Sequence, residues 1–278
     1  MRFTDQLHRP IELPAWPPRR IVSLVPSQTE LLHALGLEQE VVGITKFCVH
    51  PAAWFREKPH VGGTKTLKLE RIEALRPDLI LGNREENDRA QIEALAARWP
   101  VWMSDILTLE DACDMVLRVG ELTGRAALAT ALAREIRHRF AQLPRYQLPV
   151  HQPSGQQPAT SSLPKAAYFI WRKPYMVAAA GTFIHDMLGR AGFQNAFAHL
   201  TRYPEVTLGD LAAAQPDVLL LSSEPYPFAE KHFGPFREAC PAAQIRVVDG
   251  EMFSWYGSRL LAAAGYFEGL RREVLDER

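Results

Sequence analysis

The chain has 278 residues, of which 47% are hydrophobic, so it is long enough to fold into two lobes with buried cores. Its 32 basic and 32 acidic side chains balance, which excludes the strong positive field that attracts nucleic acid and anionic membranes. Apolar runs such as DVLLLSS are far shorter than the roughly 20 residues that span a bilayer, so no membrane insertion is expected.

The start of the chain and its cysteines bear on the compartment. The opening MRFTDQLHRPIELP has no apolar stretch of the kind found in secretory signals. We therefore expect a cytoplasmic protein if Met1 is the native start, and a periplasmic protein if a signal has been removed. Cys48, Cys113 and Cys240 are an odd set without CxxC spacing, which favours free thiols over disulfides.

The first regular elements are a strand and a helix. The segment RIVSLVPS is typical of a strand, and it leads into a helix expected to begin at a capping box, Ser27 to Glu30, and to end at Gly36. The same order recurs later, where the strand AAYFIW precedes TFIHDMLG at Thr182–Gly189, the counterpart of TELLHALG. Two parts of the chain thus share one local pattern.

A longer phrase also occurs twice. Arg71–Asn87 reads RIEALRPDLILGNREEN, and Asp210–Tyr226 reads DLAAAQPDVLLLSSEPY. In each copy a short helical pattern stops at a proline and is followed by an unbroken apolar run, which is typical of a parallel strand buried on both faces. The pattern predicts an α/β fold of two lobes, each a mostly parallel sheet flanked by helices. A single larger doubly wound sheet is the alternative.

The segments between the halves predict how they are joined. Residues 125–143 are amphipathic and contain no Gly or Pro, so we expect a single long connecting helix. Residues 144–164 are rich in Pro, Gln and Ser and are expected to form a flexible tether. The expected lobes are 1–124 and 165–278, with a ligand cleft between them. The continuous helix predicts little relative movement of the lobes.

The two halves diverge just beyond their predicted strands. The segments there are PSQT, KFCVHPAAWF and NREEN in the first half, and RKPYM, EPYPF and EMFSWYGSR in the second. Ligands of open α/β sheets bind beyond the carboxyl ends of the strands. The sequence therefore predicts a ligand site at these segments, where aromatic side chains accumulate.

Other groups in these segments suggest different chemistry. Cys48 and His50 are weak candidates for metal ligands, because no third ligand is evident. Glu85 and Glu224 occupy equivalent positions in the repeated phrase, where they fit a catalytic pair, a cation site or a polar rim. No GxSxG, P-loop or HExxH motif is present. A binding protein is therefore expected, and a cytosolic enzyme or carrier acting on a tetrapyrrole or metal chelate is the alternative.

Several motifs carry a family resemblance. RIVSLVPSQTELLHALGL, VVGITKF, RIEALRPDLIL and the closing DGEMFSWYGSRLL resemble the class III periplasmic binding proteins, and most of all the cobalamin-binding proteins of ABC importers. The resemblance runs from Phe3 to the C-terminus apart from the tether. It implies a monomeric solute-binding protein whose lobes are joined by one long helix. It also implies a cobalamin-like corrinoid, haem or a ferric chelate as the ligand, with no further cofactor required.

The resemblance implies ligand-facing residues as well, most of them aromatic side chains that stack on a flat ring. At two positions where the cobalamin-binding proteins carry tryptophan, this chain has Thr64 and Asn83. About half of these implied ligand-facing aromatic residues are expected to pack in the core instead. The implied ligand-binding residues are Pro26, Ser27, Phe47, Cys48, His50, Asn83, Trp171, Tyr175, Tyr203, Tyr226, Glu251, Phe253, Trp255 and Tyr256.

A partner is implied too, because family members dock on arginines of a membrane permease through one surface glutamate in each lobe. Glu70 occupies this position in the first lobe. The equivalent residue of the second lobe is Gly209, and its neighbour Asp210 fits the third position of a capping box begun by Thr207. Only one of the two docking positions therefore supports an ABC permease as partner.

Overall fold

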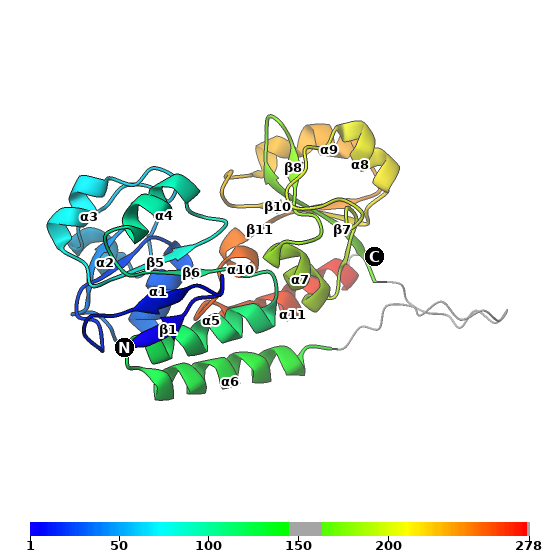
Figure 1. The fold of residues 1–278 in the computed structure, drawn as a ribbon. Coiled ribbons are helices and arrows are strands. Elements are labelled where there is room, and N and C mark those ends of the chain that lie inside the picture. The colour runs from blue at the N-terminus through cyan, green and yellow to red at the C-terminus, as the bar shows by residue number, and fades with distance from the viewer. Residues whose placement is uncertain (145–162, 277–278) are drawn as a thin grey trace. The chain divides into compact units, whose positions relative to one another are not determined.

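The computed structural model describes residues 1–144 and 163–276 of the chain (Figure 1). The chain divides into two compact units. Unit 1 comprises Met1–Arg137 and Trp255–Leu260, and unit 2 comprises His138–Ser254 and Leu261–Arg278. The division falls inside the expected connecting helix, and most of the expected tether, 144–164, lies outside the described residues.

The core of unit 1 is a four-stranded parallel sheet in the order β4-β3-β5-β6. All residues of β3, β5 and β6 are buried, as the apolar runs predict for strands covered on both faces. A hairpin of β1 and β2 packs beside the sheet, where the Gln6 N–H donates to the Met103 carbonyl. The strands of this unit are β1 (Arg2–Thr4), β2 (Pro10–Glu12), β3 (Ile21–Ser23), β4 (Val41–Ile44), β5 (Leu79–Asn83) and β6 (Val101–Ser104).

Helices flank the sheet of unit 1 (Figure 1). Two of them begin at side-chain caps: α5 at a capping box of Thr108 and Asp111, and α4 at Asp88. Helices α5 and α6 lie side by side (Figure 1), so close that a methyl group at Gly120 would clash with Ala129. The helices are α1 (Pro26–Ala34), α2 (Ala52–Glu57), α3 (Leu69–Leu75), α4 (Arg89–Ala96), α5 (Leu109–Leu122) and α6 (Ala126–Gln142), the last of which continues into unit 2.

Unit 2 is built on a five-stranded sheet in the order β11-β10-β7-β8, with β9 pairing with the start of β7. Strands β7, β9, β10 and β11 are parallel, and β8 runs antiparallel to β7. The strands are β7 (Lys165–Trp171), β8 (Met176–Val177), β9 (Gln194–Asn195), β10 (Val218–Ser222) and β11 (Gln244–Val248).

The helices of unit 2 include one, α11, whose first residue is grouped with unit 1. Within the described residues of the whole chain, no helix combines the length and the apolar character needed to cross a bilayer. The helices are α7 (Phe183–Arg190), α8 (Leu208–Ala214), the 3-10 helix η1 (Glu230–His232), α9 (Phe233–Ala239), α10 (Gly250–Ser254) and α11 (Leu260–Asp276).

The two sheets share one strand order. The series β4-β3-β5-β6 of unit 1 corresponds to β9-β7-β10-β11 of unit 2, because in both units the first parallel strand is central and the second lies outside it. The helices of the repeated phrase also end alike, at Arg76 with φ 45° and at Gln215 with φ 47°, each directly before the proline. The predicted α/β class, with parallel sheets flanked by helices, is confirmed.

The aspartate after each of these prolines has the same structural role. Asp78 accepts backbone N–H groups from Arg19 at 2.7 Å and Arg20 at 2.8 Å, just before β3 begins. Asp217 accepts the backbone N–H of Lys165 at 2.7 Å, at the start of β7. Each aspartate therefore links the beginning of one strand to the beginning of the neighbouring strand by hydrogen bonds. The repeated Pro-Asp therefore encodes the fold and not the ligand site.

The predicted start of the first helix is wrong. Helix α1 begins at Pro26, and its N-cap, Val25, makes no side-chain capping bond. Proline suits the first helical position because its missing N–H would have no partner there. Ser27 is 3% exposed inside the first turn, and Glu30 pairs with Arg259 at 2.8 Å instead of closing a capping box.

Candidate functional site

Large apolar side chains remain exposed where the strands of unit 1 end. Phe47 and Val49 follow β4 and are 50% and 39% exposed, and Leu107 follows β6 and is 37% exposed. The Lys46 ammonium lies 5.0 Å from the centre of the Phe47 ring. Exposed apolar side chains at the carboxyl ends of parallel strands are suited to contact with an apolar ligand.

Cys48 lies in the same loop but is fully buried. Thr29 Oγ1 donates to its Sγ at 3.0 Å, and Thr45 Oγ1 lies 3.2 Å from the same atom. Burial raises the pKa of the thiol, so it stays protonated at neutral pH, whereas a metal ligand must be a thiolate. His50 contacts the Trp255 ring, with 5.6 Å between centroids. Among the described residues, no three or more His, Cys, Asp and Glu side chains are grouped to hold a metal.

Asn83 ends β5 and is 2% exposed. Its Oδ1 accepts the backbone N–H groups of Glu85 at 2.8 Å and Glu86 at 3.0 Å. Its Nδ2 donates to Ser104 Oγ at 2.9 Å, across to the end of β6. The buried Asn83 side chain therefore fixes the backbone of the loop after β5. The surface there is formed by the side chains of the loop and not by Asn83.

The segment Trp255–Leu260 belongs to unit 1, although the chain on both sides of it belongs to unit 2. Tyr256 in this segment is 6% exposed. Burial, followed by the charge of Glu86, raises the pKa of this phenol well above its ordinary value. The phenol is therefore neutral over the physiological range, and the burial of its ring holds the segment against unit 1.

In unit 2, aromatic side chains gather at the end of β7. Trp171 ends this strand and is 38% exposed. The ring centroid of Tyr226, in the loop after β10, lies 5.8 Å from that of Trp171, and its backbone N–H donates to the Ile170 carbonyl at 3.3 Å. Tyr175, just before β8, packs its ring 5.1 Å from that of Phe236. We call Trp171, Tyr175 and Tyr226 the unit 2 aromatic cluster.

Arg172 and His232 join this cluster, and sequence reasoning did not single them out. Interaction with the Tyr226 hydroxyl, and next with the Tyr175 hydroxyl, raises the pKa of Arg172. His232 Nε2 lies 3.3 Å from the Tyr226 hydroxyl, and Nδ1 accepts from Ala229 N at 3.0 Å. Burial, and next the charge of Arg172, lowers the pKa of His232, so the ring is neutral at pH 7 and donates from Nε2. Arg172 stands in the RKPYM segment, whereas His232 carried no signal.

Other predicted residues of unit 2 have structural surroundings. Phe253 is fully buried, with its ring centroid 5.0 Å from that of Tyr168 and 4.7 Å from that of Phe267. It therefore packs in the core of the unit. Glu224 Oε1 accepts from the Ser254 hydroxyl at 2.7 Å, which gives this carboxylate a local role. Two further predicted residues of the unit are half-buried, namely Tyr203 and Glu251.

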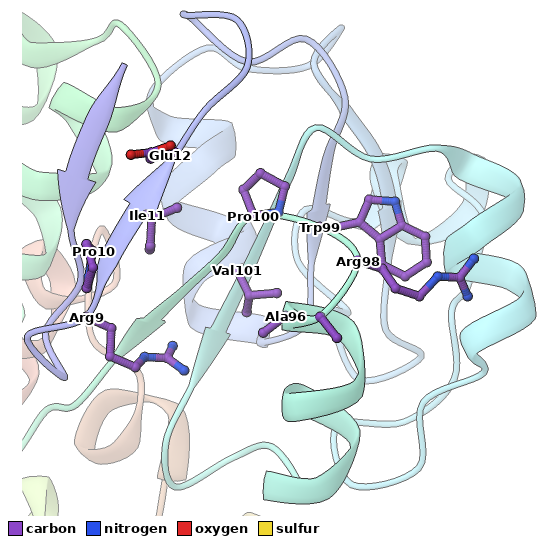
Figure 2. A pocket seen from close by; sticks show the side chains of 10 residues that line it. Arg9, Pro10, Ile11, Glu12, Ala96, Arg98, Trp99, Pro100 and Val101 are labelled. Atoms are coloured by element: carbon purple, nitrogen blue, oxygen red, sulfur yellow. The ribbon is translucent and has the colours of Figure 1, made fainter.

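A pocket of about 410 Å³ lies away from these strand ends (Figure 2). It is formed by the β1–β2 hairpin and by the turn that precedes β6, at the start of that strand (Figure 2). Its Arg9 pairs with Asp5 at 2.7 Å, and its Arg98 pairs with Glu73. Because both guanidinium groups already have carboxylate partners, the pocket offers little to an anionic solute.

The predicted docking positions lie in the exposed first turns of equivalent helices. Glu70 is exposed in the first turn of α3. Gly209 is exposed at the same place in α8, beside Asp210. The capping box predicted for Thr207 and Asp210 is confirmed, with the Thr207 hydroxyl donating to the carboxylate at 2.7 Å. Asp210 therefore serves the start of its own helix.

The α/β fold agrees with the match of this sequence to a protein family. The model of the family described as periplasmic binding protein matches residues 21–235. The chain belongs to this family. The resemblance to periplasmic binding proteins that the sequence motifs carry is thereby confirmed.

Two vitamin B12-binding proteins are similar in sequence to this chain. The vitamin B12-binding protein of Photorhabdus laumondii subsp. laumondii is 27% identical over 252 residues, covering 89% of this chain and 86% of that protein. The vitamin B12-binding protein of Vibrio parahaemolyticus is 26% identical over 210 residues, covering 74% of this chain and 71% of that protein.

Solved structures of periplasmic binding proteins share the fold. The periplasmic vitamin B12 binding protein BtuF of Vibrio cholerae superposes with a TM-score of 0.76 at 20% identity, covering 93% of this chain and 98% of BtuF. The periplasmic heme-binding protein BhuT, solved in complex with two hemes, gives a TM-score of 0.75 at 22% identity, covering 92% of this chain and 98% of BhuT. At these identities the likeness concerns the fold alone.

Proposed function

We propose that this periplasmic binding protein binds a corrinoid or another flat metal chelate through aromatic side chains at the carboxyl ends of its strands. The observation that carries the proposal is the exposure of Trp171, a large aromatic side chain that is 38% exposed beside Tyr226. Phe47, at 50% exposure, gives the strand ends of unit 1 a similar apolar character. Relatives named as vitamin B12-binding and heme-binding proteins support a macrocyclic ligand.

Stacking supplies the binding energy in this proposal. A flat macrocycle laid on an exposed indole removes apolar area from water on both partners, and one such contact contributes about 1–3 kcal/mol to binding. The Trp171 ring is held edge-on by Tyr226, whose backbone is fixed to β7 through Ile170. The platform is therefore ordered before the ligand arrives, which reduces the entropy lost on binding.

We propose a class of macrocyclic ligand and not one compound. Thr64 and Asn83 stand where the cobalamin-binding proteins carry tryptophan, and both side chains are largely buried. Asn87 Nδ2 donates to the Thr64 carbonyl at 3.0 Å, and Asn87 Oδ1 accepts from Asn83 N at 2.8 Å, so this corner is a hydrogen-bonded turn. Two stacking positions of the cobalamin-binding proteins are thus replaced, which favours testing haem and ferric chelates alongside cobalamin.

No catalytic step is part of the proposal. The relatives carry the names of binding proteins. The buried, protonated thiol of Cys48 is unsuited to nucleophilic attack, and Glu224 accepts a hydrogen bond from Ser254. The bound solute should therefore leave the protein chemically unchanged.

Delivery to an ABC permease is proposed to depend on Glu70. This carboxylate is exposed in the first turn of α3, whereas the matching position of α8 is Gly209. If a permease is the partner, Glu70→Ala should abolish solute uptake by cells while leaving solute binding by the purified protein unchanged. Uptake that is unaffected by Glu70→Ala would overturn this part of the proposal.

The proposal is tested by native mass spectrometry of the protein purified from its own host. We expect a co-purifying corrinoid, haem or ferric chelate whose absorption spectrum stays constant with time. A bound compound without a metal or a macrocycle would overturn the ligand class. A spectrum that changes steadily during incubation would indicate an enzyme instead of a binding protein.

A further inference from the structure

His232 contacts the loop after β10 at two points, one on a side chain and one on the backbone. Its Nε2 lies 3.3 Å from the Tyr226 hydroxyl, and its Nδ1 accepts the backbone N–H of Ala229 at 3.0 Å. Ala229 is the N-cap of the short helix η1, which ends at His232. The ring is 7% exposed, and it therefore closes the turn that joins this loop to the helix.

The same loop carries the ring that supports Trp171. The Tyr226 ring meets the indole edge-on, with 5.8 Å between centroids and 71° between the ring planes. The Tyr226 ring also packs against Phe228 at 4.8 Å and against His232 at 5.4 Å, again between centroids. Phe228 in turn lies 5.7 Å from the His232 ring. A movement of the His232 ring is therefore transmitted to Tyr226, the neighbour of the exposed indole.

The bond to Ala229 exists in one protonation state of the imidazole only. Nδ1 accepts a hydrogen bond through its lone pair, and protonation of the ring places a hydrogen on this atom. The imidazolium would then direct an N–H at the N–H of Ala229, so that two donors face each other in a largely buried position. This bond is lost on protonation, whereas the donor at Nε2 is retained. The loop is therefore released at its backbone contact.

The charges around the imidazole also favour its neutral form. Arg172, in the turn between β7 and β8, and Lys231, in η1, both lower the pKa of His232, after the larger effect of burial. Glu230 of η1 and Arg237 of α9 are exposed to solvent, which screens their charges. The ring therefore takes up its proton below the ordinary pKa of 6.5, in mildly acidic solution.

We propose that His232 is a positioning residue for the stacking surface: while Nδ1 accepts from Ala229 it holds Tyr226 against Trp171, and when Nδ1 is protonated this support is lost. This inference rests on the proposed function, because it assigns a pH dependence to binding at Trp171. The protein holds its macrocycle at neutral pH and binds it more weakly in mild acid. By reciprocity, a bound macrocycle makes the ring harder to protonate.

The first measurement follows Trp171 itself, without ligand. The proton–nitrogen NMR signal of its indole is identified by its loss in Trp171→Phe and is recorded from pH 8 to pH 5. We expect this signal to shift in the wild type with a midpoint below pH 6.5. The shift should persist in His199→Gln, the matched control, because His199 is an exposed histidine of the same unit. The shift should be absent in His232→Gln.

The second measurement is the dissociation constant of cyanocobalamin, a corrinoid with no group that titrates in this range. The wild type and His199→Gln should bind it about threefold to tenfold more weakly at pH 5 than at pH 7.5, the range for one lost hydrogen bond. His232→Gln is the conservative variant, because glutamine at the third position of a helix accepts the N–H of the N-cap. It should retain the tighter binding at both pH values, whereas His232→Leu should show the weaker binding at both.

An indole signal that does not respond to pH, or that still shifts in His232→Gln, would overturn the role of His232 and leave the proposed function intact. Equal affinity of the wild type at both pH values, or the same loss of affinity in His232→Gln, would also overturn it. Failure to bind cyanocobalamin at any pH, beside an indole signal that responds only when His232 is present, would contradict the proposed corrinoid ligand and support the coupling of His232 to Trp171.

Discussion

At the residue scale, aromatic side chains that look alike in the sequence fall into two kinds. Trp171 is 38% exposed, whereas Phe253 is fully buried and Trp255 is 6% exposed. Phe253 packs on Tyr168 and Phe267 inside unit 2, and Trp255 contacts His50 inside unit 1. The expectation that many of the predicted aromatic residues pack in the core agrees with these surroundings. Trp171 is the stronger candidate for stacking on a ligand.

Replacing Phe253 and Trp171 with alanine should separate packing from binding. Phe253→Ala removes a fully buried ring and should lower the free energy of unfolding by about 3–5 kcal/mol. Trp171→Ala removes an edge contact with Tyr226 and should cost about 1 kcal/mol or less. Denaturant unfolding of both variants measures the difference. Equal losses would mean that Trp171 is a packing residue.

His232 should make the stability of unit 2 sensitive to acid. Its pKa in the folded protein is lowered from the ordinary value of 6.5, first by burial. The unfolded chain therefore binds a proton more readily, and the free energy of unfolding should fall as the pH drops below about 6.5. Above that pH the ring is neutral in both states, and this effect disappears.

The variant that tests this pH dependence is His232→Gln, whose amide nitrogen can replace Nε2 as the donor to Tyr226. The stability difference between wild type and variant should be constant above neutral pH and should shrink towards pH 5. Urea unfolding at a series of pH values measures it. A difference independent of pH over this range would show that His232 does not titrate differently in the folded state.

At the scale of elements, the repeated helix–proline–aspartate–strand phrase explains why the two units share a topology. In both, the left-handed helix end, the proline and the aspartate perform the same tasks before a fully buried strand. The loops that follow differ: Asn83 organises the turn after β5, and Ser222 Oγ accepts from Glu224 N at 3.3 Å after β10. The two copies therefore diverge in sequence from the point at which their backbones no longer share a conformation.

Asp78→Asn should reveal what this aspartate contributes. Its two carboxylate oxygens accept N–H groups from Arg19 and Arg20, whereas an asparagine amide has a single acceptor oxygen. One backbone donor loses its bond, which should cost about 1–2 kcal/mol of unfolding free energy. Glu93→Gln, which breaks an exposed pair with Arg89, is the control and should leave the free energy of unfolding nearly unchanged. Equal effects would make Asp78 an ordinary surface charge.

Elements with a long, strong pattern are predictable from this sequence, and short ones are not. Strands β5 and β10 follow from unbroken apolar runs, because burial on both faces leaves no polar position. Strands β8 and β9 span two residues each and carry no periodicity. The Ser27–Glu30 spacing fits a capping box, yet the bonds depend on tertiary partners such as Arg259. Sequence spacing contains no information about such distant contacts.

The location of the candidate site could be predicted from the sequence better than the residues that form it. The strand-end segments that diverge between the halves do contain Trp171 and Tyr226. Their neighbour Arg172 interacts with Tyr175, which is close in the sequence, and with Tyr226, which is far from it in the sequence. Cys48 and Phe47 are adjacent in one loop, but one is fully buried and the other is 50% exposed. Burial is decided by packing, which local sequence does not encode.

At the scale of the whole molecule, the chain passes between its two units more than once. Helix α6 contains the boundary between Arg137 and His138, and the chain returns to unit 1 at Trp255 before α11 leads back to unit 2. The returning segment is anchored in unit 1 by Arg259 paired with Glu30 and by the buried Tyr256. The two units are therefore not separable by a single cut in the chain.

The predicted tether should be dispensable. Residues 152–162 lie outside the described residues, and their sequence lacks the apolar periodicity of a packed element. Deleting them should leave the unfolding free energy and the affinity for solute nearly unchanged, since shortening a surface loop alters its closure entropy only slightly. Loss of soluble expression on deletion would show that this segment packs against the folded units.

The central claim is that an exposed tryptophan at the end of β7 binds a flat metal chelate. The most direct test is an equilibrium titration of wild type and Trp171→Ala with cyanocobalamin and with haem, followed by the absorbance of the chelate. We predict saturable binding of at least one chelate by the wild type, weakened about tenfold to hundredfold in the variant, at a nearly unchanged melting temperature. Failure of the wild type to bind either chelate, or binding that Trp171→Ala leaves unaltered, would contradict the claim.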